Sequence, residues 1–403
     1  MLYFKKIYPI SEGLMSNKFR KIISTILALL CIVGAVSVTS CNSGNGNTNT
    51  TAGVTTVGAT TAGVTTAAPN TYSKNTYKTG DVLEKLNVLG RCVLTDNGLT
   101  ADWSASGIEF VADCKNMVKI TVNASRDCRF NFYMDDAEMK AINVTAGKKT
   151  YTLVNNLDAG VHRFRFVKST MVEHGTVGVT VEIESIELYG ELGDATAREH
   201  YIEFIGDSIT CGVGASSAAS TEAYSELSYA YLAANKLDAD YSLVSISGIG
   251  AGKSTDRHGG LLMGEVYSLN NYYRSKTDKY EPSRKADLVV INLNTNDKGS
   301  FDQVSMKEQF VAKVKDLIDQ VKALHGEDVK IVWVMGMMND PSYLYVDAWT
   351  MQYLRSLGGE EAGYYYFLAE KNNARASSHP IASAHASVAN SLAEFINSKG
   401  ILG

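Results

Sequence analysis

The stretch YIEFIGDSITCGVG, residues 201–214, places a serine directly after a short apolar strand whose only interruption is Glu203. Gly206 stands two residues ahead of Ser208 and permits a tight turn there. A hydroxyl at such a strand end can act as a nucleophile when a base takes its proton and backbone N–H groups face the carbonyl that it attacks. Serine after a strand also commonly caps the following helix. Ser208 is therefore a candidate nucleophile, with helix capping as the alternative.

Three later segments carry groups that would complement a serine nucleophile. Gly248 follows the apolar segment YSLVSIS, where a glycine lets a backbone N–H approach a ligand closely. Asn296 lies in NLNTND, after another apolar segment, and its amide could donate to an oxyanion. His379 precedes a proline just ahead of the last predicted helix and could serve as the base. These residues predict a nucleophile, an oxyanion hole and a base.

A second histidine, His385, competes with His379 for the role of base. It lies six residues later, at the start of the last predicted helix, where a structural role is expected. His379 is favoured because catalytic groups tend to lie in loops. Asp207 and Asp297 are expected to make capping and turn hydrogen bonds. The remaining histidines share no metal-ligand spacing, so we expect neither a metal nor a cofactor.

The region 197–403 contains the elements that would position these groups, because strand-like and helix-like segments alternate along it. The segments 286–293 and 329–336 have apolar residues at consecutive positions, as in strands buried on both faces. Ser305 and Glu308 predict a capping box at the start of a helix that ends at Gly326. This pattern predicts a parallel sheet covered by helices, with ligands at the carboxyl ends of the strands. The apolar stripe of that helix comprises Phe310, Val314, Leu317, Val321 and Leu324.

The region 80–193 has a different periodicity, in which apolar and polar residues alternate. In MVKITVNA, residues 117–124, every second side chain is apolar, and HRFRFVKS alternates phenylalanine with arginine. Such short strands, separated by turn sequences such as DNG, are typical of an antiparallel sheet. We therefore predict an antiparallel β-sandwich domain of jelly-roll-like type ahead of the α/β domain.

The first 41 residues have the order of a bacterial lipoprotein leader. A basic segment, 18–21, precedes an apolar run, 22–38, and the sequence VTSC that ends at Cys41 resembles a lipobox. Cys41 would then be lipidated and would hold the protein on the outer surface of the cell. The alternative is a transmembrane anchor, since the apolar run is nearly long enough to span a membrane. Residues 42–79, rich in Thr, Gly and Ala, predict a flexible tether.

Charge and cysteine content narrow the class further. The 38 basic and 43 acidic residues give a net charge of −5, without the basic excess of nucleic-acid-binding proteins. Beyond the leader, the cysteines have no C-x-x-C pair and no zinc spacing. Either a disulfide in the first domain or four buried thiols would fit. These cysteines are Cys92, Cys114, Cys128 and Cys211.

Aromatic residues have two expected uses. Trp103 and Trp333 are expected in the cores of the two domains. Trp349, with Tyr343 and Tyr345, could stack on sugar rings at the crevice, although loop aromatics are common for other reasons. Asp340 ends a predicted strand and could also reach the crevice.

The ordered set GDSIT, SISG, NTND and HP resembles the four sequence blocks of the SGNH, or GDSL-type, hydrolases. The segments DWSASGIEF, WVMGMMND and HPIASAH, with the preceding sandwich, are similar to carbohydrate esterase family 2 acetyl esterases. The resemblance spans roughly residues 82–402, and therefore both predicted domains.

This resemblance implies an SGNH-type three-layer α/β domain and a role for each candidate residue. Ser208 would be the nucleophile and His379 the base, without a metal. The N–H groups of Ser208 and Gly248 and the side chain of Asn296 would form the oxyanion hole. Members of the family remove acetyl groups from xylan and glucomannan.

Two positions depart from the pattern of the family. Many SGNH hydrolases have an aspartate three residues before the histidine, and Ala376 stands there. A Ser–His dyad, with a backbone carbonyl accepting from the histidine, would then replace the triad. Asn294 occupies a position that is usually glycine, so its side chain could narrow the crevice or disturb Asn296.

The sequence therefore predicts an exported, membrane-tethered carbohydrate O-acetyl esterase that acts on acetylated polysaccharides or oligosaccharides. The alternative is a surface lipoprotein that keeps the fold, binds carbohydrate and has weak or no catalysis. A third possibility is an esterase that acts on lipids or on bacterial envelope glycans. No nucleic-acid partner is expected.

Overall fold

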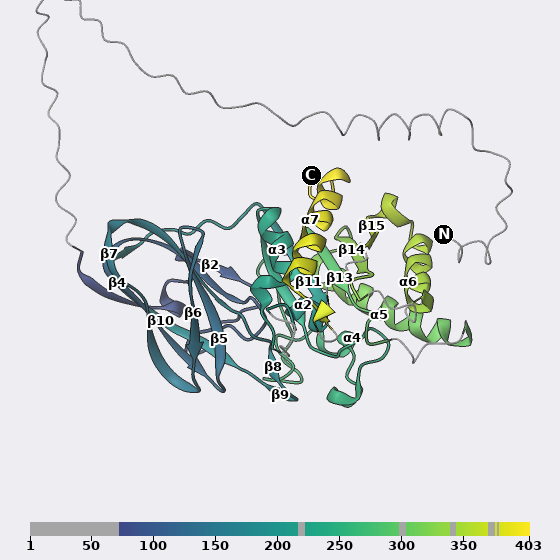
Figure 1. Ribbon diagram of the computed structural model, residues 1–403, viewed down its shortest axis with the longest axis horizontal. Helices are drawn as coiled ribbons and strands as arrows, with labels where there is room; N and C mark the ends of the chain where they lie inside the picture. Colours follow the sequence, from purple (N-terminus) through teal and green to yellow (C-terminus); the bar gives the residue numbers. More distant parts are fainter. Residues whose placement is uncertain (1–71, 217–221, 298–303, 339–343, 370–374, 377–378) are drawn as a thin grey trace, which may run out of the picture. The chain divides into compact units, whose positions relative to one another are not determined.

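The computed structural model describes residues 72–216, 222–297, 304–338, 344–369, 375–376 and 379–403. The first part of this chain forms an antiparallel sheet and the second part a parallel sheet (Figure 1). Both predicted sheet types are confirmed. The two sheets belong to one compact unit, residues 67–403.

The parallel sheet brings the predicted site segments to one edge. In its register Gly206 lies opposite Ser245 on one side and opposite Asn292 on the other. The loops that carry Ser208, Gly248 and Asn296 therefore leave neighbouring strands at the same, carboxyl-terminal edge. The strand order is β12 (Ala239–Ser245), β11 (His200–Gly206), β13 (Leu288–Asn292), β14 (Lys330–Met335) and β15 (Tyr364–Leu368).

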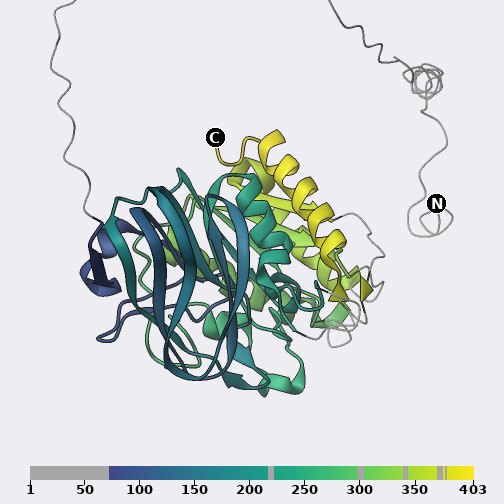
Figure 2. The same cartoon turned by 60° about the vertical axis from the view of Figure 1, so that its left-hand side comes forward.

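Helices cover both faces of this sheet. Successive side chains of β11 point to opposite faces, so neighbouring residues of this strand contact different helices. Phe204 packs edge-on against Tyr229 of α3, with ring centroids 6.2 Å apart. The adjacent Glu203 reaches His325 of α5 on the other face. The helices α3 and α7 lie side by side in both views (Figures 1 and 2), and α5 contacts α4 and α6. The helices are α2 (Ser208–Cys211), α3 (Tyr229–Lys236), α4 (Met263–Val266), α5 (Lys307–His325), α6 (Leu344–Ser356) and α7 (Ala382–Ser398).

The antiparallel domain is built on two long strands, β4 and β7, that pair along almost their whole length. Register shifts between Cys114 and Lys119 mark bulges, which bend a strand and let one sheet enclose its own core. Stacked phenylalanines fill this core, for example Phe130 on Phe166 with ring centroids 4.3 Å apart. The strands run in the order β1 (Lys74–Lys78), β10 (Val181–Leu192), β4 (Gly107–Ala124), β7 (Gly147–Lys168), β5 (Cys128–Met134) and β6 (Ala137–Val144), while β2 (Leu86–Leu89) pairs with β4 and β3 (Leu99–Thr100) with β10.

Two local predictions differ from the structure. The strand β1 lies within residues 42–79, the predicted tether, and pairs with β10, so the folded region begins before residue 80. The capping box of Ser305 and Glu308 is wrong: α5 begins at Lys307, after a short 3-10 turn, and no side chain caps it. The backbone passes directly from that 3-10 turn into α5, without a side-chain cap between them. The buried stripe of α5 is otherwise as predicted, including Phe310 and Val314.

The leader and the cysteines have separate outcomes. The apolar run 22–38 and Cys41 lie outside the described residues, and no described helix is long and apolar enough to cross a membrane. The later cysteines are free thiols, of which Cys92 is half-buried and the others are buried. Of the two alternatives for them, the structure therefore shows thiols rather than a disulfide.

A buried carboxylate explains the one polar residue in the strand that leads to Ser208. Glu203 is completely buried and pairs with the equally buried Arg91 of the antiparallel domain through bonds of 2.7 and 2.9 Å. Tyr267 and Ser242 also donate to it, at 2.7 and 2.6 Å, and His325 lies at 3.1 Å. Burial alone would raise the pKa of Glu203, but Arg91 and His325 hold that pKa well below its ordinary value. The carboxylate is therefore charged and joins both domains.

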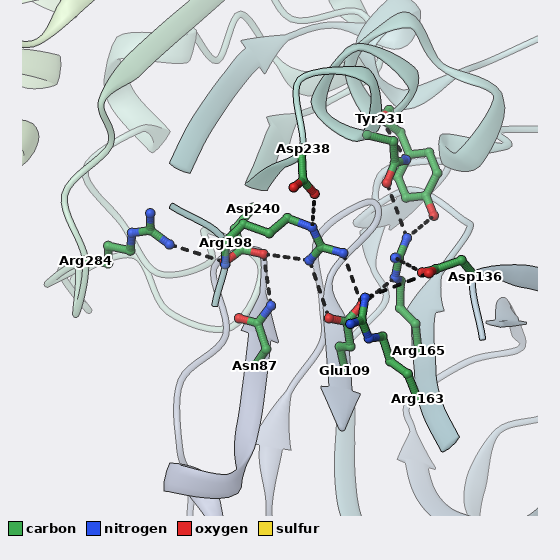
Figure 3. A network of polar contacts seen from close by, with 11 residues as sticks. Asn87, Glu109, Asp136, Arg163, Arg165, Arg198, Tyr231, Asp238, Asp240 and Arg284 are labelled. Atoms are coloured by element: carbon green, nitrogen blue, oxygen red, sulfur yellow. Dashed lines mark hydrogen bonds and ion pairs between the residues drawn. The ribbon is translucent and has the colours of Figure 1, made fainter. Parts of the chain in front are cut away.

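A second polar network crosses between the domains nearer the surface (Figure 3). Arg165 of β7 donates to Glu109 at 2.9 Å and to the Tyr231 hydroxyl of α3 at 3.2 Å. Arg198, just ahead of β11, pairs with Asp240 of β12 at 3.0 Å and reaches Glu109 at 3.4 Å. Buried networks of this kind hold packed elements in one arrangement when each member is paired.

Replacing Arg91 by alanine is expected to destabilise the chain by about 3–5 kcal/mol, because it leaves the Glu203 carboxylate buried without its main counter-charge. Urea unfolding of the full chain at neutral pH, followed by circular dichroism, measures the change.

Arg163→Ala is the matched control, since Arg163 is half-exposed and its closest ion-pair contact with Asp136 is 3.8 Å. Its cost should stay within about 0.5 kcal/mol. Equal costs for the two variants would contradict the importance of the buried pair.

Candidate active site

Ser208 lies at the sharp turn from β11 into α2. A side chain at Gly206 would place its Cβ 2.0 Å from Thr210 Oγ1, so this turn requires glycine. Asp207, rather than Ser208, is the N-cap of α2, because its carboxylate accepts the Ile209 N–H at 2.9 Å. Ser208 is therefore the first residue of the helix, and capping does not occupy its hydroxyl.

His379 contacts Ser208, as the sequence predicts. Its Nε2 lies 2.9 Å from Ser208 Oγ. When the hydroxyl donates to Nε2, the proton of the neutral imidazole lies on Nδ1. Burial lowers the pKa of His379, which keeps the ring neutral and able to accept the serine proton near pH 7.

The histidine is held by a short strand pair instead of a carboxylate three residues earlier. The strands β16 (Arg375–Ala376) and β17 (His379–Pro380) pair antiparallel, and Ala376 lies opposite His379. Alanine has no carboxylate, and burial is the cause of the lowered pKa of His379. The described contact of this histidine with the candidate nucleophile is the one between His379 Nε2 and Ser208 Oγ.

His385 is a structural histidine. It is completely buried in α7, and its Nδ1 accepts the backbone N–H of Tyr229 at 3.1 Å. The two rings stack with an interplanar angle of 6°. Burial lowers the pKa of His385 to about 3, so it stays neutral and links α7 to α3. The contacts thus favour His379 over His385 as the base.

Two backbone N–H groups, those of Ser208 and Gly248, are the candidate donors of an oxyanion hole. Gly248 has φ +86°, and a Cβ there would lie 2.5 Å from Thr255 Oγ1, so glycine is required on both counts. Within the described part of the chain, the N–H groups of Ser208 and Gly248 donate to no other residue. Free donors at neighbouring strand ends are what a tetrahedral oxyanion needs.

Asn296 lies beside these donors, but its amide is already engaged. Its Nδ2 donates to Asp207 Oδ2 at 3.1 Å and to the Ile249 carbonyl at 2.7 Å. Asn296 thus ties the serine turn to the loop after β12. To stabilise an oxyanion as predicted, it would have to share one of these hydrogens with the substrate oxygen. Its role as third donor stays a prediction.

Two buried aspartates support the same loops. Asp297 accepts the backbone N–H groups of Ala251, Gly252 and Lys253 at 3.1, 2.6 and 2.7 Å, in line with the turn role expected of it. Burial raises the pKa of Asp297 to about 6 and that of Asp207, which also faces Asp297, to about 7. Asp207 caps α2, in line with the capping role expected of it, but the sequence did not reveal that it also accepts from Asn296.

Asn294 does not turn toward Asn296. Its φ of +85° explains why glycine is usual at this position, since asparagine is among the residues that best tolerate the left-handed region. Its amide donates to Asp347 at 3.2 Å and to Thr350 at 3.3 Å, both on α6. The Asn294 amide therefore bonds to α6, and the expectation that this side chain narrows the crevice or disturbs Asn296 stays a prediction.

The aromatic residues divide between core and surface. Trp103, Trp333 and Trp349 are buried. Trp333 lies in the core of the α/β domain as predicted, but Trp103 also packs with that core and not with the core of the antiparallel domain, so its predicted place is wrong. Tyr345 is 46% exposed, and its ring centroid lies 5.7 Å from that of Trp349. Of the proposed stacking residues, Tyr345 alone among those described has a surface to offer. Asp340 and Tyr343 lie outside the described residues.

A parallel α/β sheet with Ser208 and His379 in contact beyond the end of β11 is the arrangement that the resemblance to the GDSL-type hydrolases implies. Residues 204–364 match the GDSL-like Lipase/Acylhydrolase family, and residues 88–184 match the Carbohydrate esterase 2 N-terminal family. The match in the α/β domain confirms the resemblance to the GDSL-type hydrolases, and the match in the antiparallel domain confirms the resemblance to carbohydrate esterase family 2.

Two curated relatives and one solved structure show the same similarity. The chain is 30% identical over 244 residues to the cellulase/esterase CelE of Acetivibrio thermocellus, covering 58% of this chain and 29% of CelE. It is 30% identical over 238 residues to the acetylxylan esterase / glucomannan deacetylase of Cellvibrio japonicus, covering 53% of this chain and 61% of that protein. The matched region is thus less than two thirds of either relative.

The fold is similar to that of the acetyl xylan esterase Est2A from the rumen bacterium Butyrivibrio proteoclasticus. The TM-score is 0.74 at 20% identity, and the superposition covers 82% of this chain and 100% of Est2A. At this identity the likeness establishes the shared fold of the two chains.

The acid limb of the pH profile of kcat/KM is expected to have its midpoint below pH 6.5, the ordinary pKa of histidine, because burial lowers the pKa of His379. Protonated His379 cannot accept the serine proton, so activity should fall as pH drops through that lowered value. Hydrolysis of p-nitrophenyl acetate between pH 4 and 8 measures the limb.

Circular dichroism across the same pH range serves as the control for acid unfolding. A midpoint clearly above 6.5 would contradict the Ser–His pair, since a carboxylate partner raises a histidine pKa.

Proposed function

We propose that this protein is a carbohydrate O-acetyl esterase that removes acetyl groups from plant cell-wall polysaccharides such as xylan and glucomannan. The contact of 2.9 Å between His379 Nε2 and Ser208 Oγ carries the proposal. The family matches, together with the esterase and deacetylase activities for which the two curated relatives are named, support the substrate class.

The proposed reaction proceeds through an acetyl-serine. Ser208 Oγ attacks the acetyl carbonyl carbon while its proton moves to His379 Nε2. The N–H groups of Ser208 and Gly248, with a shared hydrogen of Asn296, stabilise the oxyanion. The bond from carbon to the sugar oxygen then breaks, and that oxygen takes the proton from His379. Water then attacks the acetyl-serine and gives a proton to His379. The bond between the acetyl carbon and Ser208 Oγ breaks, His379 returns the proton to Ser208 Oγ, and acetate leaves.

No step requires a metal, because neutral His379 moves each proton and the backbone carries the developing charge. The missing carboxylate at Ala376 lowers the stabilisation of the imidazolium rather than preventing proton transfer. In a full triad, loss of correct tautomer control costs about 10⁴ in rate. We expect a smaller loss here, because a backbone carbonyl can accept the Nδ1–H.

The full chain is expected to release acetate from acetylated xylan and acetylated glucomannan, whereas Ser208→Ala should release none above background. Enzymatic determination of acetate measures the reaction, and the polymer that reacts faster identifies the better substrate. Removal of the nucleophile abolishes the acetyl-serine and with it turnover.

Asn296→Ala in the same assay should lose about 10²–10³ in kcat if Asn296 is the third oxyanion donor. Retention of full activity in this variant would show that Asn296 serves only to tie the two loops. A folded chain that binds these polymers without releasing acetate would favour the carbohydrate-binding alternative.

We further propose that the protein is exported and anchored to the cell surface through a lipid on Cys41. The order of basic, apolar and small residues before that cysteine supports this. A single cysteine at the end of such a leader is the attachment point in this class of protein, and the segment that follows it is rich in residues typical of flexible tethers.

Bacterial cells that express the full chain are grown with a radioactive fatty acid. The wild type is expected to carry the label, and Cys41→Ser is not. Cys92→Ser is the matched control and should keep the label, because Cys92 belongs to the folded antiparallel domain. Equal labelling of wild type and Cys41→Ser would refute the anchor.

A further inference from the structure

A hairpin of the antiparallel domain reaches the loop that follows β12. It consists of β8 (Glu173–His174) and β9 (Val177–Gly178), whose labels lie beneath the parallel-sheet elements in Figure 1. Glu173 is buried, with 2% of its surface exposed, and its Oε1 accepts the backbone N–H of Ser247 at 3.0 Å. The acceptor comes from one domain and the donor from the other.

Ser247 is held at its other polar atoms as well. The ring Nε2 of His258 donates to the Ser247 carbonyl oxygen at 2.7 Å. Arg257 donates to Ser247 Oγ at 3.3 Å and, from its Nε, to the Gly175 carbonyl of the hairpin at 3.1 Å. Donors and acceptors thus fix Ser247 from two sides.

The orientation of Ser247 determines where the next N–H points. The Ser247 carbonyl and the Gly248 N–H belong to one planar peptide group, and in a trans peptide they point in opposite directions. No peptide bond in the described chain is cis. The His258 bond to the carbonyl therefore aims the Gly248 N–H, while the Glu173 bond fixes the preceding peptide. Gly248 itself, at φ +86°, offers little resistance to rotation.

We propose that Glu173 and His258 are positioning residues, which clamp Ser247 so that the Gly248 N–H meets the oxyanion of the transition state. Of these two bonds that hold the oxyanion hole, the antiparallel domain then supplies the one from Glu173 and the α/β domain the one from His258. This inference rests on the proposed esterase function and assigns a role in it to a residue outside the α/β domain.

The clamp predicts a change in kcat with little change in KM. An oxyanion exists only in the transition state, so a misaimed donor leaves substrate binding almost unchanged. A donor displaced by about 1 Å can cost up to 10²-fold in rate. We expect Glu173→Ala and His258→Ala to lower kcat for p-nitrophenyl acetate by about 10- to 100-fold.

Glu173→Gln separates positioning from charge. Burial raises the pKa of Glu173 to about 7, so a neutral side chain of the same shape fits this environment. The glutamine carbonyl can still accept the Ser247 N–H, and kcat should return close to the wild-type value. His174→Ala is the matched control, because His174 is the exposed neighbour of Glu173 on β8.

Steady-state kinetics of the full chain and these variants, with thermal unfolding of each, test the clamp. Wild-type kcat in folded Glu173→Ala and His258→Ala, beside an inactive Ser208→Ala, would overturn the clamp and leave the esterase function standing. If Glu173→Ala does not fold, His258→Ala decides, since His258 is only half-buried and ends the short 3-10 helix Asp256–His258. A folded wild type without esterase activity would overturn both proposals.

Discussion

The burial of one charged carboxylate, that of Glu203, constrains the rest of the structure. A carboxylate without partners inside a protein would cost several kcal/mol, so every element that packs against this face of β11 must supply a donor. The antiparallel domain supplies Arg91, β12 supplies Ser242, the segment after α4 supplies Tyr267, and α5 supplies His325. The two domains, β12 and α5 are therefore held in place around a single group, the Glu203 carboxylate.

The position of this carboxylate matters because β11 ends at the candidate nucleophile. Ser208 lies five positions after Glu203. A bond of 2.9 Å between Ser208 and His379 requires that the strand, the turn and the short pair β16–β17 keep their places within a fraction of an ångström. The cap at Asp207 and its bond from Asn296 continue this fixed arrangement into the loops. A rigid strand thus delivers a reactive side chain to an edge where loops supply the other groups.

Much of this could be predicted from the sequence, because the governing patterns are local. Periodicity alone separates the antiparallel from the parallel part, and the residue types at strand ends identify Ser208, Gly248 and His379. The positions that the sequence does not explain depend on distant partners. Asn294 has its hydrogen-bond partners on α6. Glu203 was visible only as a polar interruption of an apolar run, and its partner, Arg91, lies 112 residues earlier in the chain. Single-sequence patterns do not encode such pairings.

The antiparallel domain could be regarded as a binding module attached to a self-sufficient α/β enzyme. Its contacts argue otherwise. Arg91 completes the core beneath β11, the Arg165 and Glu109 network secures α3, and Glu173 reaches the loop of Gly248. An α/β domain without these partners would contain Glu203 without the Arg91 counter-charge and Ser247 without the bond to Glu173. Removing the antiparallel domain would therefore disturb the strand and the loop that form the candidate site, which depends on both domains.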